Sequence, residues 1–354
     1  MHWYRLGRPI DVAVPSLGNA VVRIGKTASK SVVFFGVDGE GPDKIDYGGT
    51  GTLLVCFENG VNVPVLVTCR HVAEALSKHP QFYIRANTQG GQSLAMPIQS
   101  LEWAYPDDGT IDLAATVFTL PASLFDVIYY RLHAASAVLT DDERARIHCG
   151  EPVSLIGLFR LHPGKQRNIS CVHTGNVAVL PDPIERIPIR DRTTGEIVEA
   201  EVYLVEAQTL DGLSGSPVFL HEMIDLEQIN LELRPQIYTH PKAFGVVKLL
   251  GIYSGSWDGE PGQILAADRG LHGKIRVPVG MGTVVPIDQV EKLIREHPIM
   301  KKKNKEFIQS VLAQRAASQD SAISDPPSGD ANPTHREDFK SLLGAAVKKP
   351  VRED

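Results

Sequence analysis

The sequence has little cysteine. Its 354 residues include four, Cys56, Cys69, Cys149 and Cys171, and no two of them form a Cys-x-x-Cys pair. The missing pair argues against a zinc ribbon, and the low count excludes a small scaffold held together by disulfides. Four thiols allow three disulfide pairings, but we expect reduced, buried thiols in a reducing compartment.

Long apolar runs and an excess of positive charge are also absent. No segment approaches the roughly 20 apolar residues of a membrane span, and residues 1–9 contain no uninterrupted apolar stretch like that of a signal peptide. Lys and Arg total 36 against 42 Asp and Glu, a net charge of −6 that provides no overall basic surface for nucleic acid. These absences predict a cytoplasmic protein without nucleic-acid or membrane partners.

The apolar residues that are present predict an all-β fold. A hydrophobic fraction of 43% is sufficient for a substantial core. These residues fall in short segments rich in β-branched and aromatic side chains, which favours a barrel or sandwich over alternating strands and helices. The expected strands are residues 20–24, 31–35, 52–57, 63–68, 110–118, 150–157, 170–179, 202–207, 246–253 and 282–286.

Helices are expected only between and after these strands. Thr140 is a candidate cap for a short helix in the connection 121–147. Asp288 is the expected N-cap of a closing helix over 287–297, whose apolar residues have helical spacing. The remaining segments are an N-terminal extension over 1–18, insertions at 181–200, 222–244 and 258–277, and a largely disordered tail over 298–354 with one weak helix near 306–316.

One serine stands in a glycine-rich turn, Gly212-Leu213-Ser214-Gly215-Ser216. Glycines allow a turn that exposes a serine hydroxyl and aims neighbouring N–H groups at one point. A reactive serine also needs a base and a carboxylate that orients the base. His71 stands at the end of one expected strand and Asp112 directly precedes another. Ser214, His71 and Asp112 are therefore the candidate catalytic residues.

Other residues compete for these roles. Asp107 and Asp108 lie in a Pro-Asp-Asp-Gly turn, where solvated carboxylates are usual, so Asp112 is preferred. Ser216 is expected to line the serine turn without attacking. A single His at a strand end is more often structural than catalytic, and the case for His71 depends on the motifs around it. The other histidines lack metal-ligand spacing, and we expect neither a metal nor a cofactor.

Seven short motifs follow one another in a set order between residues 20 and 297. They are Gly49-Thr50-Gly51-Thr52, Val67-Thr68-Cys69-Arg70-His71-Val72, Asp112-Leu113-Ala114, Gly150-Glu151-Pro152-Val153, Gly212-Leu213-Ser214-Gly215-Ser216-Pro217, Gly251-Ile252 and Gly282-Thr283-Val284-Val285-Pro286. Together they resemble the chymotrypsin-like (trypsin-fold) serine peptidases, and more closely their disulfide-free HtrA-like branch. The resemblance implies two six-stranded antiparallel β-barrels, barrel one over about 19–120 and barrel two over about 150–286, with the active site between them.

The resemblance also implies residue roles. Ser214 would be the nucleophile, His71 the general base and Asp112 the group that orients it. The backbone N–H groups of Gly212 and Ser214 would form the oxyanion hole. The substrate-binding site would be framed by Gln208 and by the edge strand Ser254, Gly255 and Ser256.

Two departures from the family narrow the expectation. Leu213 stands where digestive relatives carry an Asp that pairs with a freed N-terminus, so activation by N-terminal cleavage is not expected. Gln208 is neutral, which argues against strict cleavage after Lys or Arg. The expected function is a serine endopeptidase that cleaves protein or peptide substrates. The alternatives are a weakly active or inactive scaffold of the same fold and an esterase, and an activating partner protein is also left open.

Overall fold

The computed structural model describes residues 28–41, 44–132, 139, 141–207, 212–223, 245–259 and 277–324. The expected strand 20–24, Thr140, Gln208, most of the insertions 222–244 and 258–277, and the tail beyond 324 lie outside the described residues. The chain divides into two compact units, residues 1–308 and 309–354. No helix in the described part of the chain is long and apolar enough to cross a membrane.

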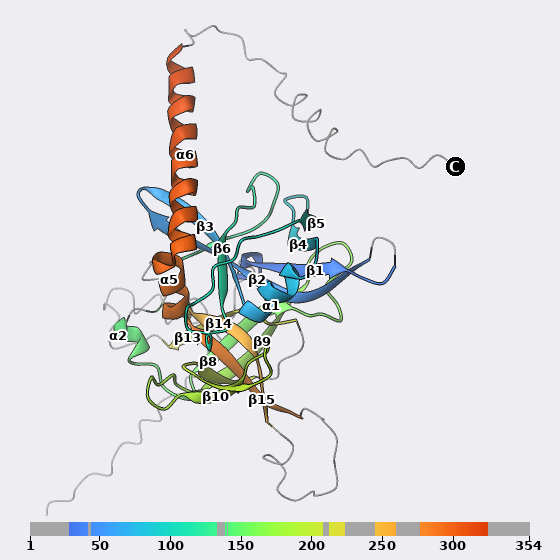
Figure 1. Ribbon diagram of the computed structural model, residues 1–354, viewed down its shortest axis with the longest axis vertical. Helices are drawn as coiled ribbons and strands as arrows, with labels where there is room; N and C mark the ends of the chain where they lie inside the picture. The colour runs from blue at the N-terminus through green and yellow to red at the C-terminus, as the bar shows by residue number, and fades with distance from the viewer. Residues whose placement is uncertain are drawn as a thin grey trace, which may run out of the picture. The chain divides into compact units, whose positions relative to one another are not determined.

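The first sheet contains seven strands in the order β5-β4-β1-β2-β3-β6, with β7 paired to β2 (Figure 1). The predicted strands at 31–35, 52–57, 63–68 and 110–118 correspond to β1, β2, β3 and β6, whereas β4 and β5 were not predicted. The bounds are β1 Val32–Asp38, β2 Ile45–Glu58, β3 Val61–Thr68, β4 Phe82–Asn87, β5 Ser93–Ile98, β6 Ala114–Val117 and β7 Tyr130–Arg131.

The expected closure of barrel one is wrong, because this sheet is open. Strand β6 has only four residues, which pair with β3 on one side. On its other side, within the described residues, it makes a single isolated bridge between Ala115 and Ala104 and does not pair with β5. The sheet is also not purely antiparallel, since β7 runs parallel to β2.

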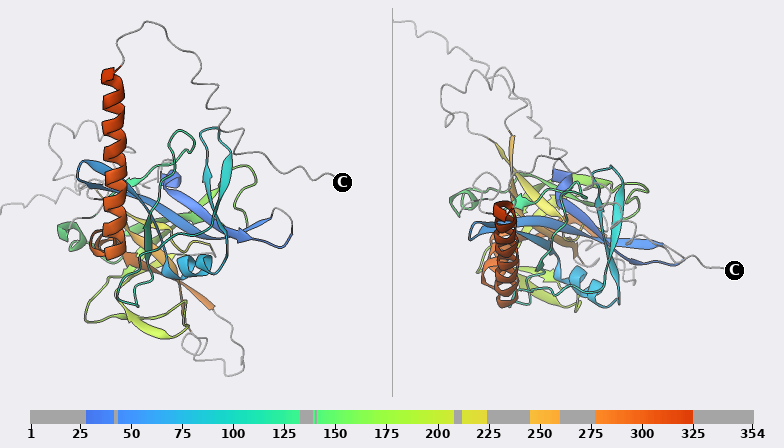
Figure 2. Two further views of the ribbon diagram at one scale, coloured as in Figure 1. Left: turned by 45° about the horizontal axis from the view of Figure 1, so that its top comes forward. Right: turned by 90° about the horizontal axis from the view of Figure 1, so that it is seen from above.

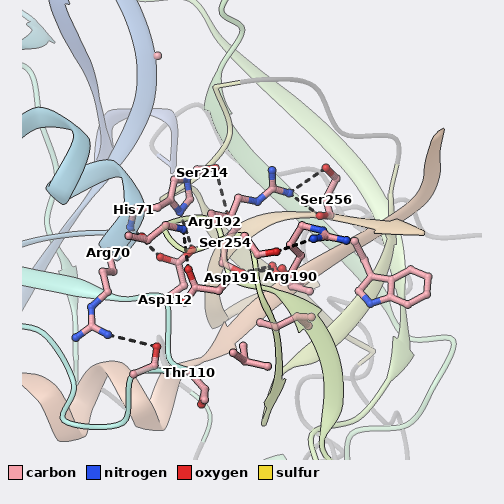
Figure 3. A pocket seen from close by; sticks show the side chains of 18 of the residues that line it. Arg70, His71, Thr110, Asp112, Arg190, Asp191, Arg192, Ser214, Ser254 and Ser256 are labelled. Carbon is pink, nitrogen blue, oxygen red and sulfur yellow. Dashed lines mark hydrogen bonds and ion pairs between the residues drawn. The ribbon is translucent and has the colours of Figure 1, made fainter. Parts of the chain in front are cut away.

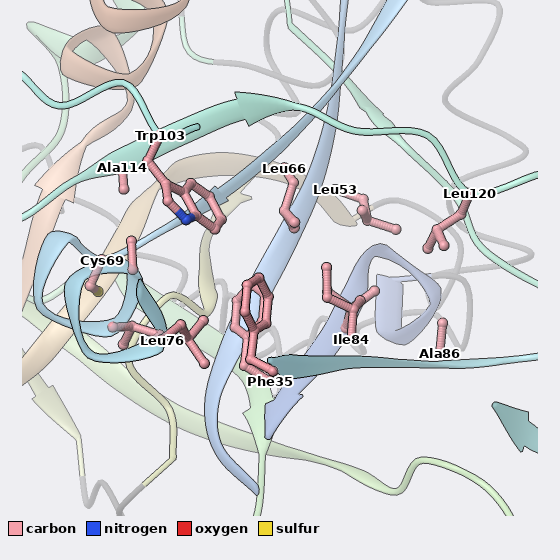
Figure 4. Close-up of a cluster of buried hydrophobic side chains, with 14 of the residues drawn as sticks. Phe35, Leu53, Leu66, Cys69, Leu76, Ile84, Ala86, Trp103, Ala114 and Leu120 are labelled. Atoms are coloured by element: carbon pink, nitrogen blue, oxygen red, sulfur yellow. The ribbon is translucent and has the colours of Figure 1, made fainter. Parts of the chain in front are cut away.

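The side chains of the first sheet contribute to a buried apolar cluster (Figure 4). Phe35 from β1 lies near its centre, with Phe82 at 6.4 Å and Trp103 at 6.3 Å between ring centroids, both in edge-to-face geometry. Such aromatic pairs add to the free energy of burial. Helix α1, Arg70–Ser77, covers the same cluster through Val72, Ala73 and Leu76. The core therefore fixes the helix on which His71 lies.

The second sheet is a closed six-stranded antiparallel barrel in the order β12-β15-β14-β13-β8-β9. Its strands are β8 Pro152–Leu158, β9 Ser170–Val179, β12 Tyr203–Ala207, β13 Pro217–Met223, β14 Gly245–Gly259 and β15 Val277–Pro286. Five of the six correspond to predicted β segments, whereas β13, which follows the serine turn directly, was not predicted. Figures 1 and 2 show the blue strands of the first sheet beside the green to orange strands of this barrel.

Outside the barrel, the predicted insertion 181–200 folds as an antiparallel hairpin of β10 Ile187–Arg190 and β11 Ile197–Ala200. A short 3₁₀ turn, Ala28–Ser31, precedes β1, and α2 is Asp141–Arg144. The closing helix α5 covers Ile287–Glu296, as expected over 287–297. Asp288 is not its N-cap: Pro286 takes that position with an extended ψ of 149°, and Asp288 lies in the first turn. A carboxylate there still interacts favourably with the helix dipole.

The tail also differs from expectation. The weak helix expected near 306–316 is part of a longer helix, α6, which covers Pro298–Ser324. Its first turns bury Met300, Asn304 and Ile308 in the first unit. Of these, Met300 and Ile308 are apolar, and their burial gives the helix stability from tertiary packing in addition to its propensity.

Candidate active site

A cleft of about 380 Å³ brings the predicted catalytic residues together. His71 comes from α1, Asp112 from the segment before β6, and Ser214 from the turn before β13. The lining also includes Ser254 and Ser256 of β14. Figure 3 shows these side chains converging on the cleft, with dashed lines joining Asp112 to His71.

The carboxylate of Asp112 holds His71 by two bonds. The backbone N–H of His71 donates to Asp112 Oδ1 at 3.0 Å, and its ring Nδ1 lies 2.7 Å from Asp112 Oδ2. The first N–H groups of a helix lack intrahelical acceptors, and Cys69 at the N-cap provides no side-chain bond, so Asp112 caps α1 from another segment. Because a carboxylate only accepts, Nδ1 carries the proton and Nε2 is the acceptor of the neutral ring.

Two threonines of the first sheet donate hydrogen bonds to the serine turn. Thr50 Oγ1 donates to the carbonyl of Gly212 at 2.8 Å, and Thr52 Oγ1 donates to that of Gly215 at 2.7 Å. The amide of Thr50 donates to the carbonyl of Ser214 at 3.0 Å. Gly215 has a φ of +91°, and a Cβ on it would overlap the carbonyl oxygen of Thr50. The turn can therefore approach this strand so closely only with glycine at 215.

The hydroxyl of Ser214 does not bond to His71. It donates instead to the backbone carbonyl of Ser254 at 3.3 Å, and within the described residues no hydrogen bond joins Ser214 to His71. A hydroxyl changes its partner by rotation about χ1, and catalytic hydrogen bonds often form fully only when substrate is bound. Attack therefore requires the hydroxyl to leave Ser254.

The two expected oxyanion donors lie at the same turn. Gly212 has a φ of +99° and is followed by Leu213, whose side chain is fully buried in the barrel core. In the part of the chain that is described, the N–H groups of Gly212 and Ser214 have no bonded acceptor. Both residues line the cleft, and an oxyanion hole would require these two N–H groups to point to one oxygen there.

Of the expected substrate-binding residues, Gln208 lies outside the described residues, and the other three form the rim of the cleft on β14. Ser254 is buried, with its Oγ 2.7 Å from Thr283 Oγ1 on β15. Gly255 and Ser256 follow where the pairing with β15 shifts register. Strand β13 pairs with β14 only up to Ile252, so the edge of 254–256 away from β15 faces the cleft.

Among the described residues, Cys69 lies close enough to His71 and Asp112 to suggest a metal site. Its Sγ and the side-chain ligand atoms of His71 and Asp112 lie within 4.8 Å of one another. However, Cys69 is fully buried and its thiol donates to the carbonyl of Tyr253 at 3.2 Å. Burial, and then the charge of Asp112, raises the pKa of this thiol well above its usual range. Nδ1 of His71 and Oδ2 of Asp112 are bonded to each other, so each of the three side chains already has a hydrogen-bond partner.

Two other serines, Ser216 and Ser154, are buried and do not line the cleft. Ser216 is fully buried beside Gly157, and its Oγ has no hydrogen-bond partner among the described residues, so it does not reach a substrate in the cleft. Ser154 forms a second serine–histidine pair, 2.8 Å from Nε2 of His221, between β8 and β13. Both residues of this pair are buried, His221 is 7% exposed, and neither lines the cleft.

Sequence reasoning missed two groups at the site. Thr50 and Thr52 were noted only as part of a motif, although their side chains hold the serine turn. Arg192 at the tip of the β10–β11 hairpin lines the cleft, and its Nη2 donates to the carbonyl of Ser256 at 2.6 Å. No local signal separates Arg192 from other charged hairpin residues, because its partner is 64 residues away.

Comparison with known proteins finds similar solved structures but no match by sequence. No family model and no curated protein matches the chain. Its structure is similar to the inactive form of Rv3671c from M. tuberculosis, with a TM-score of 0.39 and 16% identity over 79% of this chain and 92% of that one.

Two further solved structures are similar. A serine endoprotease from Yersinia pestis matches with a TM-score of 0.37 and 17% identity, covering 76% of this chain and 65% of that chain. The HtrA-type protease AlgW, solved with a decapeptide, has a TM-score of 0.40 and 13% identity over 78% of this chain and 67% of that one. These are structural matches to trypsin-fold serine proteases at low sequence identity. Any assignment of function therefore depends on the geometry of the cleft.

Proposed function

We propose that the protein is a serine endopeptidase in which Ser214, His71 and Asp112 form the catalytic triad. The observation that carries the proposal is that Asp112 forms two hydrogen bonds with His71 in a cleft that Ser214 also lines. With its proton on Nδ1, His71 presents Nε2 as a base for the hydroxyl of Ser214. The carboxylate then stabilises the imidazolium as it forms.

The reaction has two halves. The Oγ of Ser214 attacks the scissile carbonyl while His71 takes the hydroxyl proton, and the carbonyl oxygen becomes an anion that the N–H groups of Gly212 and Ser214 bind. His71 returns the proton to the leaving amine, which leaves an acyl group on Ser214. Water, activated by His71, then hydrolyses this ester. The substrate class that we propose is a polypeptide in extended conformation, and a cytoplasmic location remains a prediction.

One observation favours the alternative of a weakly active or inactive scaffold. The hydroxyl of Ser214 donates to the carbonyl of Ser254 and not to His71. If the hydroxyl stays there, His71 cannot take its proton, and the cleft could bind a peptide without cleaving it. The two functions therefore differ in the reactivity of one atom.

A small fluorophosphonate measures this reactivity directly, because it labels only an activated serine. We expect the wild type to be labelled and Ser214→Ala not at all. The variants His71→Ala and Asp112→Asn should react roughly 100-fold or more slowly, because they lose the base or its orientation. Asp107→Asn is the matched control, since Asp107 is an exposed carboxylate of the same loop, and it should react like the wild type.

Circular dichroism establishes that each variant is folded. A folded wild type that stays unlabelled would rule out the endopeptidase and leave the scaffold. If the wild type is labelled, hydrolysis of casein compared with that of a p-nitrophenyl ester separates a peptidase from an esterase.

A further inference from the structure

The β10–β11 hairpin, residues 187–200, is referred to here as the strap. Its base is apolar: Ile189, Ala200 and Val202 form a small buried cluster against which Trp257 packs. The indole N–H of Trp257 also donates to the carbonyl of Pro188 at 2.9 Å. Because Trp257 directly follows the cleft edge 254–256 on β14, the strap is anchored next to the place where a substrate would lie.

The tip of the strap has a fixed shape. Asp191 Oδ1 accepts the amides of Thr193 at 2.7 Å and Thr194 at 2.8 Å, and the Asp191 carbonyl accepts the amide of Gly195. Side-chain bonds of Asp to the following amides are typical of a stable turn. Arg192 and Thr193 are therefore presented as a rigid unit and not as a loose loop.

This tip occupies the cleft edge of β14. Arg192 Nη2 donates to the carbonyl of Ser256 at 2.6 Å and lies 3.2 Å from its hydroxyl (Figure 3). A Cβ on Gly255 would overlap the guanidinium, so the glycine permits this close contact. The carbonyl of Ser256 is on the side of β14 that faces the cleft, and Arg192 already uses it.

The strap also contacts helix α1 and the loop that precedes β6. Thr193 Oγ1 donates to Glu74 Oε2 at 2.9 Å, and Glu74 lies on α1, three residues after His71. Arg186, which directly precedes the strap, forms an ion pair with Asp108 at 3.6 Å. Asp108 lies in the loop that leads to Asp112. The strap is thus bonded to the helix that carries His71 and to the loop that leads to Asp112.

We propose that the strap closes the cleft, and that the Arg192–Ser256 contact must open before an extended peptide can bind. This inference rests on the proposed function. An extended chain adds to a free strand edge through backbone hydrogen bonds, and on the edge 254–256 the acceptor it would use is taken by Arg192. The peptide and the tip of the strap therefore compete for the same carbonyl.

The contacts of the tip differ in kind from those of the base. Arg192, Thr193, Asp108 and Arg186 are solvent-exposed or nearly so, and exposed polar contacts contribute little each. The base is buried and apolar. The tip can therefore lift while the base stays in place. If the closed state dominates, the apparent affinity for a peptide falls by the fraction of open molecules.

Removing the tip contacts should therefore increase activity on long substrates only. We expect Arg192→Ala to raise kcat/KM for fluorescein-labelled casein about five-fold or more, and Thr193→Val to act in the same direction. Labelling by the small fluorophosphonate, which needs no bond to β14, should change less than two-fold. Glu199→Gln on the exposed side of β11 is the matched control and should leave both rates unchanged.

A binding measurement separates this inference from the proposed function. In the Ser214→Ala background, which cannot cleave, Arg192→Ala should lower the Kd for labelled casein in fluorescence anisotropy. If the wild type is not labelled by the fluorophosphonate, the proposed function fails, and the anisotropy still tests the strap. Equal casein binding with and without Arg192 overturns the strap, as does weaker binding, which would make Arg192 a substrate-binding residue.

Discussion

At the scale of single residues, the serine turn depends on side chains of the other sheet. Ser214 is held through the carbonyls on either side of it, by Thr50 on Gly212 and by Thr52 on Gly215. Each threonine is fully buried, and because the Thr52–Gly215 bond is itself buried, the loss of the Thr52 hydroxyl leaves a buried carbonyl without its partner. Unpaired buried groups cost about 1–3 kcal/mol. The position of the nucleophile therefore depends on two side chains of the first sheet.

We predict that Thr52→Val lowers both stability and reactivity. Valine keeps the shape but not the hydrogen bond, so the free energy of unfolding should fall by about 1–3 kcal/mol and the labelling of Ser214 should slow about ten-fold. Urea unfolding and fluorophosphonate kinetics measure the two effects. Thr116→Val is the matched control, because Thr116 is equally buried and donates one bond to a carbonyl, that of Glu102, away from the turn. A similar loss of labelling in both variants would mean that the turn responds to general destabilisation only.

At the scale of secondary-structure elements, β8 and β13 are joined by a buried polar pair, Ser154 and His221. Burial lowers the pKa of His221 below its usual range. In the unfolded chain the same ring takes up a proton near pH 6.5. Below that pH the unfolded state therefore binds more protons than the folded state, and stability falls as the pH falls.

We predict that this loss reaches up to about 1.4 kcal/mol per pH unit until the pH drops below the pKa of His221 in the folded protein. His221→Gln keeps a hydrogen-bonding group but cannot titrate, so its unfolding free energy should depend less on pH between 6.5 and 5 than that of the wild type, as about one proton fewer is taken up. Denaturant unfolding at several pH values measures the difference. The exposed His148→Gln is the control. Parallel curves for the wild type and His221→Gln would contradict the assignment.

Elements were predictable where apolar residues dominate the segment. β1, β3 and β8 are almost wholly buried, and their β-branched runs indicate strands without further context. β4 and β5 were missed because Arg85, Asn87 and Pro97 interrupt the apolar pattern, and a proline is tolerated only at a sheet edge or irregularity. The open first sheet could not be foreseen, since closure depends on how far β6 extends.

In the candidate site, too, some features follow from local sequence and others do not. The motifs of the serine turn and of His71 predict which residues meet, because each stands at the end of an element. They do not predict that the hydroxyl of Ser214 bonds to Ser254, or that Arg192 bonds to Ser256, because both contacts join segments at least 40 residues apart. Contacts of this kind follow from the packing of the two sheets and not from local sequence.

At the scale of the whole molecule, the two sheets are also joined far from the cleft. Arg85 of β4 is only 5% exposed. Its guanidinium donates to the carbonyls of Pro163 at 3.3 Å and Lys165 at 3.2 Å, which belong to the loop between β8 and β9. Asn87 and Asn168 support the junction, since the amide of Asn168 donates to Asn87 Oδ1 at 2.7 Å. Burial lowers the pKa of Arg85, and the adjacent Tyr47 ring lies 5.2 Å from the guanidinium carbon.

We predict that Arg85→Lys loosens this junction. An ammonium keeps the charge but cannot reproduce the planar fork that reaches two carbonyls and Ser93 Oγ at once. The free energy of unfolding should fall by about 1–3 kcal/mol, and the amides of Ser93 and Asn168, which bond across the junction, should exchange with deuterium faster. Arg131→Lys, on the exposed side of β7, is the control. Because the threonines of the first sheet still hold the serine turn, fluorophosphonate labelling should stay within about two-fold of the wild type, and a large loss would mean that the cleft depends on this remote junction as well.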